Sequence, residues 1–124
     1  MTRKLLKGII GRSDDQRRAN ARRSILRHLA RVGGTVFGST PQGVRREFFC
    51  LDPHTWVWHE EWYDQNGQHQ AMTTRYDIRP NAILKSQGVH AYQALSPQEE
   101  RNFRRATHIY YQRASHELQR LAAA

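Results

Sequence analysis

The chain has 124 residues, of which 38% are hydrophobic, and this is enough for one compact domain with its own apolar core. Its single cysteine, Cys50, excludes a disulfide framework, and no apolar run approaches the ~20 residues of a membrane-spanning helix. The formal net charge of +9 favours polyanionic partners, although it says nothing about the fold.

The charge is concentrated near the N-terminus. Residues 1–31 hold ten basic and two acidic residues, a net charge of +8, whereas residues 32–124 hold ten basic and nine acidic residues, a net charge of +1. We therefore expect a basic, partly apolar extension over residues 1–12 and a single domain over residues 13–124. The body of the domain is close to neutral, so its charge does not explain what it does.

The extension alternates basic residues with leucine and isoleucine, but Gly8 and Gly11 each lower helix stability by about 1 kcal/mol. We expect this segment to be flexible. Its arginine-rich amphipathic pattern also resembles a mitochondrial presequence, which makes import a minor alternative to a cytoplasmic location. The acidic pair Asp14 and Asp15, directly after it, argues against import.

A first helix is expected over residues 13–32. Ser13 and Gln16 have the spacing of a capping box, and a glycine pair follows Val32. At 100° per residue an apolar stripe forms a face that we expect to lie against the core, and it comprises Ala21, Ile25, Leu29 and Val32. A row of arginines lies on the opposite side, at Arg23, Arg27 and Arg31.

From residue 35 to residue 95 the apolar period changes to two, and turn signals recur at Asp52-Pro53, Asn66-Gly67 and Pro80-Asn81. Strands are expected at 44–51, 55–63, 70–79 and 82–86, with a possible short fifth near 90–95. A second helix is expected over residues 97–121, because Ser96, Pro97 and Glu99 form a helix-start signal. The predicted fold is α+β, an antiparallel four-stranded meander flanked by an N-terminal and a C-terminal helix.

A two-residue hairpin at Asn66-Gly67 would place Trp58 opposite Arg75. A possible stacking face would then comprise Trp56, Trp58, Trp62 and Arg75. Extending the register through the Asp52-Pro53 turn adds Phe49 and Leu51 to this face, but it also sets Glu47 against Glu60, a like-charge pair that disfavours it. Two arrangements stay open: one helix covers each face, or both helices cover the other face and leave the tryptophans open to stack on bases.

Successive cations along one helix can neutralise successive phosphates, so we expect the N-terminal helix to bind nucleic acid. The candidate contacts are Lys7, Arg12, Arg17, Arg23, Arg27 and Arg31. RNA is favoured, with ribosome association as one setting, because the sequence holds no motif for reading a defined DNA sequence. The alternative is a protein-interaction or assembly module, which would use the sheet or the C-terminal helix while its basic arm contacts a partner or an anionic membrane surface.

The sequence favours a non-enzymatic protein, and a small hydrolase or nuclease is the third hypothesis. His59 and Glu61 share a strand face, but no third ligand accompanies them to form a metal site, so we expect Arg46 or water as their partner. Cys50 lies among apolar residues and is expected to be a buried thiol. No catalytic residue, cofactor or metal is expected.

Overall fold

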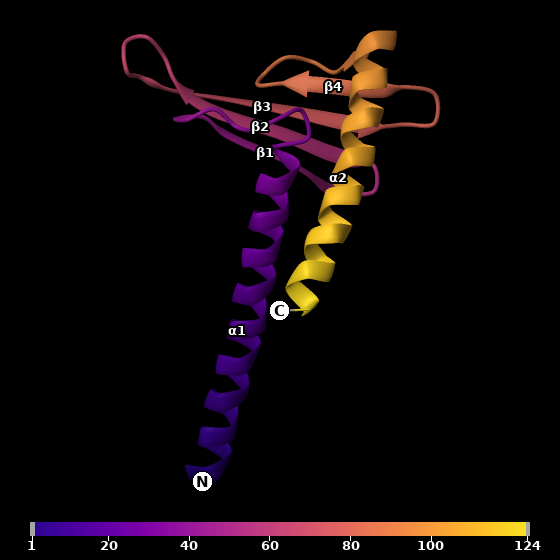
Figure 1. Cartoon of the computed structure of the whole chain (residues 1–124). Helices are drawn as coiled ribbons and strands as arrows, with labels where there is room; N and C mark the ends of the chain where they lie inside the picture. Colours follow the sequence, from indigo (N-terminus) through magenta and orange to yellow (C-terminus); the bar gives the residue numbers. More distant parts are fainter. Residues whose placement is uncertain (1, 124) are drawn as a thin grey trace.

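The computed structural model describes the backbone of residues 2–123 and the side chains of residues 13–123. It confirms the α+β class, with two helices and an antiparallel sheet that has five strands rather than the expected four (Figure 1). The strands lie in the sheet in chain order, which makes it a meander. The elements are α1 (Thr2–Gly33), β1 (Arg45–Asp52), β2 (Thr55–Tyr63), β3 (His69–Ile78), β4 (Ile83–Gln87), β5 (Gln93–Ala94) and α2 (Pro97–Ala123).

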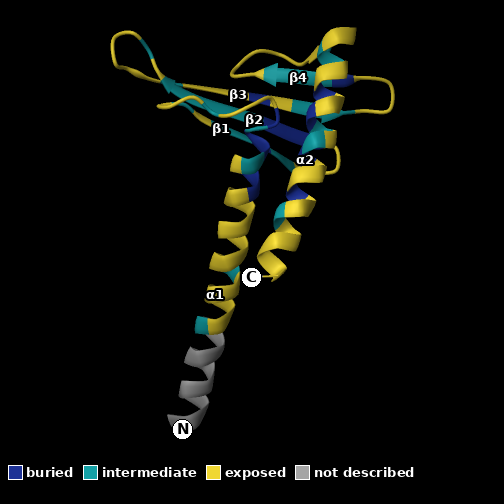
Figure 2. Ribbon diagram, viewed as in Figure 1, coloured by how far each residue is buried: buried dark blue, intermediate teal, exposed yellow. Residues whose placement is uncertain are grey.

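Helix α1 begins earlier than expected and packs only near its C-terminal end. Because the helix starts at Thr2, Ser13 lies inside it rather than at its N-cap. Of the predicted core stripe, Leu29 is buried, whereas Ala21 is exposed and Ile25 is 39% exposed. Only the last turns of α1 reach the sheet, and the preceding turns extend away from the body into solvent (Figure 2). The apolar stripe therefore continues beyond the core that it was expected to cover.

At the C-terminal end of α1 the helix backbone lies directly against the backbone of the edge strand β1. A Cβ atom at Gly33 would lie 2.0 Å from the carbonyl oxygen of Phe48, and one at Gly34 would lie 2.2 Å from that of Arg46. Neither glycine has a positive φ angle, so their role is to admit this approach rather than to adopt a left-handed conformation. The glycine pair that was expected only to end the helix also seats α1 on the sheet.

Helix α2 begins at the predicted capping box. The Ser96 hydroxyl accepts a hydrogen bond from the Glu99 backbone N–H (3.2 Å), and the Glu99 carboxylate accepts one from the Ser96 N–H (3.1 Å). The side chains that α2 buries recur at three- and four-residue steps: Phe103, Ala106, Tyr110 and Ala114. This spacing places one face of α2 against the sheet.

The register of the β2–β3 hairpin differs by one residue from the prediction. Trp58 lies opposite Thr74 and Val57 lies opposite Arg75, so the expected pairing of Trp58 with Arg75 is wrong. In a strand a shift of one residue moves every side chain to the other face. The prediction therefore placed the odd-numbered residues of β3, Arg75 among them, on the face of the tryptophans, where the structure has the even-numbered residues.

The cause of this shift is Asp64, whose side chain organises a longer turn. Its carboxylate accepts hydrogen bonds from the backbone N–H groups of Asn66 and Gln68, both at 2.9 Å, while the Gly67 N–H donates to the Asp64 carbonyl at 3.0 Å. Gly67 has a φ of +75°. This geometry is a type I turn followed by a left-handed residue, a three-residue hairpin loop rather than a two-residue one.

The corrected register defines the two faces of the sheet. One face, here called the tryptophan face, carries Phe48, Cys50, Trp56, Trp58, Trp62 and Tyr76. Phe49 and Arg75 lie on the other face, which contradicts their predicted place beside the tryptophans, and Leu51 lies at an irregularity of the β1–β2 ladder between Cys50 and Asp52. Glu47 lies opposite His59 and Arg46 lies opposite Glu60, so the like-charge pair that disfavoured the predicted register is absent from this ladder.

Both helices leave the sheet on the same side, and they cover the tryptophan face (Figure 1). Phe48 and Trp56, each 1% exposed, lie at the centre of the core and pack against Phe103 and Tyr110 of α2. Neither expected arrangement is therefore correct. Covering this face buries Phe48 and Trp56, whose rings contribute a large apolar area to the core.

Candidate nucleic-acid interface

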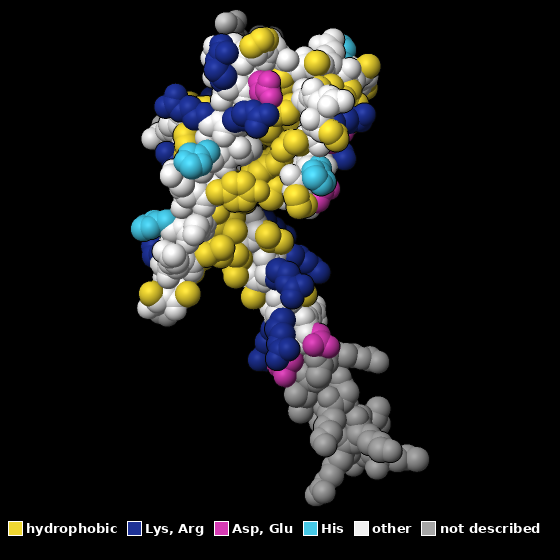
Figure 3. All heavy atoms as spheres, turned by 90° about the vertical axis from the view of Figure 1, so that its right-hand side faces the viewer, with side chains coloured by type: hydrophobic (Ala, Val, Ile, Leu, Met, Phe, Trp, Pro, Cys, Tyr) yellow, Lys and Arg dark blue, Asp and Glu magenta, His cyan; other side chains and the backbone are white. Residues whose placement is uncertain are grey.

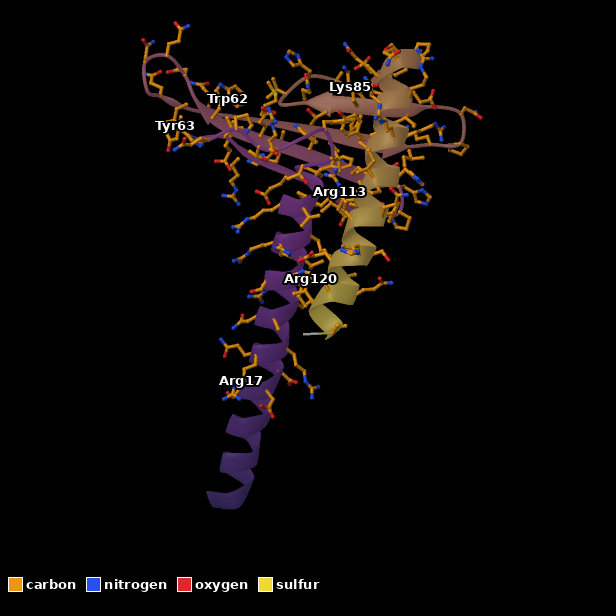
Figure 4. All side chains as sticks on the ribbon, viewed as in Figure 1. Arg17, Trp62, Tyr63, Lys85, Arg113 and Arg120 are labelled. Atoms are coloured by element: carbon orange, nitrogen blue, oxygen red, sulfur yellow. The ribbon has the colours of Figure 1, made fainter. Side chains whose placement is uncertain are left out.

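The arginines of α1 are exposed along the helix, including its last turns, where the neighbouring Leu29 and Ala30 are buried. Arg17, Arg23, Arg27 and Arg31 are all exposed, and dark-blue side chains follow this stretch of the helix in Figure 3. Figure 4 places Arg17 on the part of α1 that extends past the C-terminal end of α2. The side chains of the other two predicted contacts, Lys7 and Arg12, lie outside the described residues.

Three of these arginines form a row directed away from the body. Arg23, Arg27 and Arg31 follow each other at four-residue steps, so each lies about 6 Å further along the helix axis than the last. Arg27 and Arg31 are each two residues from the buried Leu29, which places them about 160° around the helix from it. The row is therefore directed towards solvent on the side opposite the core.

The arginines of α1 differ from most basic residues of the body because they have no carboxylate partner among the described side chains. None of Arg17, Arg23, Arg27 and Arg31 forms an ion pair with another described side chain. Ion pairs elsewhere join Arg45 to Glu47 (2.9 Å), Arg46 to Glu60 (3.4 Å), Lys85 to Glu99, Arg104 to Glu100 (2.8 Å) and Arg120 to Glu117 (2.5 Å). The positive charge of α1 is thus available to an external anion.

Glu117 of α2 holds α1 in place. Its carboxylate pairs with Arg120 and accepts a hydrogen bond from His28 of α1, whose Nε2 lies 2.7 Å away. These bonds, that of Arg120 first, lower the pKa of Glu117 to about 2. A second contact joins the Arg113 guanidinium to the Thr35 hydroxyl at 2.9 Å. Sequence reasoning missed both contacts because their partners are far apart in the chain.

The structure does not bring the four residues of the predicted stacking face together on one accessible surface. Trp56 is buried in the core, and Arg75 is on the opposite face of the sheet. Trp58 and Trp62 remain partly exposed on the tryptophan face, and Trp62 lies towards the β2–β3 hairpin, at the end of the sheet away from α2 (Figure 4). Of the four residues, only these two are accessible on the tryptophan face.

A groove follows the uncovered part of the tryptophan face beside α2. Two adjoining hollows of about 330 and 460 Å³ share Trp58, Thr74 and Gln87. We call them together the tryptophan groove, which is lined by Phe37, Trp58, Trp62, Met72, Gln87 and Asn102 among others. Phe37 belongs to the loop after α1, Gln87 ends β4, and Asn102 is on α2, so sequence reasoning had no single motif from which to find this groove.

His59 and Glu61 lie together on the other face of the sheet, as expected, but with different partners. The Glu61 carboxylate is 3.0 Å from His59 Nε2, 2.9 Å from His69 Nε2 and 3.7 Å from Arg45, and Arg46 is on the opposite face. The hydrogen bond from His59, before the other contacts, lowers the pKa of Glu61. Within residues 13–123, no cluster has the arrangement of a metal site.

Cys50 is a half-buried free thiol on the tryptophan face. Burial is the main cause that raises its pKa, and a raised pKa reduces the thiolate fraction that nucleophilic attack requires. The thiol therefore has the properties of a packing residue rather than of a nucleophile.

No helix in the described part of the chain has the length and hydropathy needed to cross a bilayer. Comparisons of the chain with protein families, with curated proteins and with solved structures find no match.

Proposed function

We propose that this protein is a non-enzymatic nucleic-acid-binding protein, with RNA as the favoured ligand, and that α1 supplies its phosphate contacts. The observation that carries the proposal is the contrast between the two sets of arginines. Those of α1 are exposed and form no ion pair with a described side chain, whereas seven of the ten basic residues after residue 31 form ion pairs with carboxylates of the body. A polyanion is the ligand that this distribution favours.

Contacts of this kind position a nucleic acid without reading its sequence. Arginines about 6 Å apart along a helix can each engage a phosphate, and every engaged phosphate releases condensed counterions. The affinity should consequently fall steeply with salt, by about 0.7 to 0.9 in log affinity per phosphate for each decade of salt.

The test is a salt titration with a labelled RNA stem-loop, followed by fluorescence anisotropy between 50 and 200 mM salt. A variant carrying Arg23→Ala, Arg27→Ala and Arg31→Ala should bind more weakly, with a slope shallower by about 2 to 3. Competition by a DNA duplex tests the preference for RNA. If the variant keeps both the affinity and the slope of the wild type, α1 does not provide the contacts.

A charge-matched variant separates this effect from the loss of net charge. Arg79→Ala, Arg101→Ala and Arg104→Ala together remove the same number of positive charges from exposed positions on the body. We expect this variant to keep most of the wild-type salt slope, because these arginines lie off α1. An equal loss in both variants would mean that total charge, and not the helix, determines binding.

Assembly with a protein partner is the second candidate function. It is favoured by apolar side chains that the two helices leave exposed, Leu26 at 58% and Leu118 at 45%. Sedimentation over a range of concentrations, with and without RNA, tests self-association as the simplest form of this function. Glutamine substitutions at both leucines should abolish any association that depends on them and, because they add no charge to α1, leave the salt slope of RNA binding unchanged.

A further inference from the structure

The tryptophan groove contains an open pair of aromatic rings. Phe37 and Trp58 have ring centroids 6.1 Å apart and planes inclined at 45°. Phe37 is 60% exposed, so its ring is held by few contacts, and the next residue, Gly38, has a φ of +124° with no atom near a Cβ position. A small movement of this loop would bring the Phe37 ring to stacking distance from a planar ring placed over Trp58. Nucleobases are planar rings that stack on aromatic side chains in this way.

Two side-chain amides of the groove are oriented by hydrogen bonds within the protein. The Gln87 amide nitrogen donates to the Thr74 hydroxyl at 3.0 Å, which leaves its oxygen as an acceptor. The Asn102 oxygen accepts a hydrogen bond from Gln98 at 3.1 Å, which leaves its amide nitrogen as a donor. One acceptor and one donor beside an aromatic ring suit the edge of an unpaired base.

The groove carries little net charge. Its two carboxylates are already paired, Glu60 with Arg46 at 3.4 Å and Glu99 with Lys85. A phosphate inside the groove would meet these carboxylates, whereas an uncharged base would not. Arg105 has no ion-pair partner among the described residues, and it lies three residues after Asn102, about one helical turn along the same side of α2. A phosphate at the rim of the groove could reach this arginine.

We propose that the tryptophan groove binds an unpaired nucleobase of the same RNA that α1 contacts. The proposal rests on the proposed function and specifies it further, since it assigns single-stranded RNA to the groove and phosphates to α1. The base stacks between Phe37 and Trp58, and its edge meets the amides of Gln87 and Asn102. Trp62 and Met72 extend the same floor towards a neighbouring base.

The experiment compares one RNA sequence in two forms, a single strand and the same strand annealed to its complement. The variant is Phe37→Ala, which removes an exposed ring and should leave the circular dichroism spectrum unchanged. We expect it to bind the single strand about tenfold more weakly and to bind the duplex with nearly wild-type affinity. Phe37→Tyr should restore single-strand binding, because it restores the ring.

Leu51→Ala is the matched control, because Leu51 is 59% exposed and does not line the groove. It should bind both RNA forms like the wild type. If Phe37→Ala binds the single strand as well as the wild type does, or weakens both forms equally, the groove does not bind a base, even if the α1 arginines still determine the salt slope. If the wild type binds neither form, the proposed function itself is wrong, and the assignment of the groove to a base is then wrong as well.

Discussion

Replacing Gly33 by alanine should destabilise the fold, because α1 reaches β1 at a distance that admits no side chain. The added Cβ would lie 2.0 Å from the Phe48 carbonyl oxygen and 2.9 Å from Cδ2 of Tyr110. An ordinary contact begins near 3.4 Å, so the end of α1 must move away from the sheet by more than an ångström. This movement would open the contact that buries Leu29.

The expected magnitude is the difference between two effects. Forcing extra atoms into a well-packed site costs about 3 kcal/mol, at the upper end of the usual range because backbone atoms stand in the way. Alanine is a better helix former than glycine by about 1 kcal/mol, and Gly33 has no positive φ that would oppose the substitution. The net loss is about 2 kcal/mol, which for a domain of this size lowers Tm by roughly 6 to 10 °C.

Urea and thermal unfolding followed by circular dichroism measure this loss. Ser24→Ala on the exposed surface of α1 is the control, because it also raises helix propensity but contacts no strand. It should leave stability unchanged or slightly increased. A Gly33→Ala protein as stable as this control would refute the reasoning, since it would show that the end of α1 is not seated against β1 in solution.

Two further predictions concern single carboxylates. The lowered pKa of Glu117 stabilises the fold fully above the ordinary value of 4.5, and this contribution is lost as the pH falls towards about 2. The urea midpoint of Glu117→Gln should therefore be lower than that of the wild type at pH 7, and the two should converge near pH 2; parallel curves would contradict the role of Glu117 between the helices. Asp64→Ala should cost about 1 to 2 kcal/mol, because the turn N–H groups of Asn66 and Gln68 lose their acceptor, whereas Asp64→Asn should retain part of the stability. Chemical denaturation of both variants measures this difference, and equal stability of alanine and wild type would show that the turn does not depend on this side chain.

The elements that sequence reasoning predicted well are those whose signals are local. The start of α2 follows from Ser96 and Glu99, three residues apart, and its buried face follows from its own periodicity. The hairpin register was wrong because it depends on one side chain, Asp64, which competes with the backbone preference of Asn66-Gly67 for a two-residue turn. One such hydrogen-bonding side chain is enough to exchange the two faces of a strand.

The same difference between local and long-range signals applies to the candidate site. The arginine row of α1 was predictable from spacing, because residues four apart share a side of any helix. The tryptophan groove was not, since Phe37, Gln87 and Asn102 come together only through the meander and the crossing of α2 over it. Which face the helices cover depends on the packing of Trp56 and Phe48, and periodicity alone did not distinguish the two faces.

The extension of α1 beyond the body makes the proposed ligand contacts bivalent. From Arg17 to Gly33 the helix axis covers roughly 24 Å, so a phosphate bound at Arg17 and a base bound in the groove lie far apart on one RNA. Once the first contact forms, the second is intramolecular and gains an effective concentration set by the RNA between them. Affinity should then rise sharply once an oligonucleotide is long enough to span both contacts, and a shorter one should bind with the affinity of one contact alone.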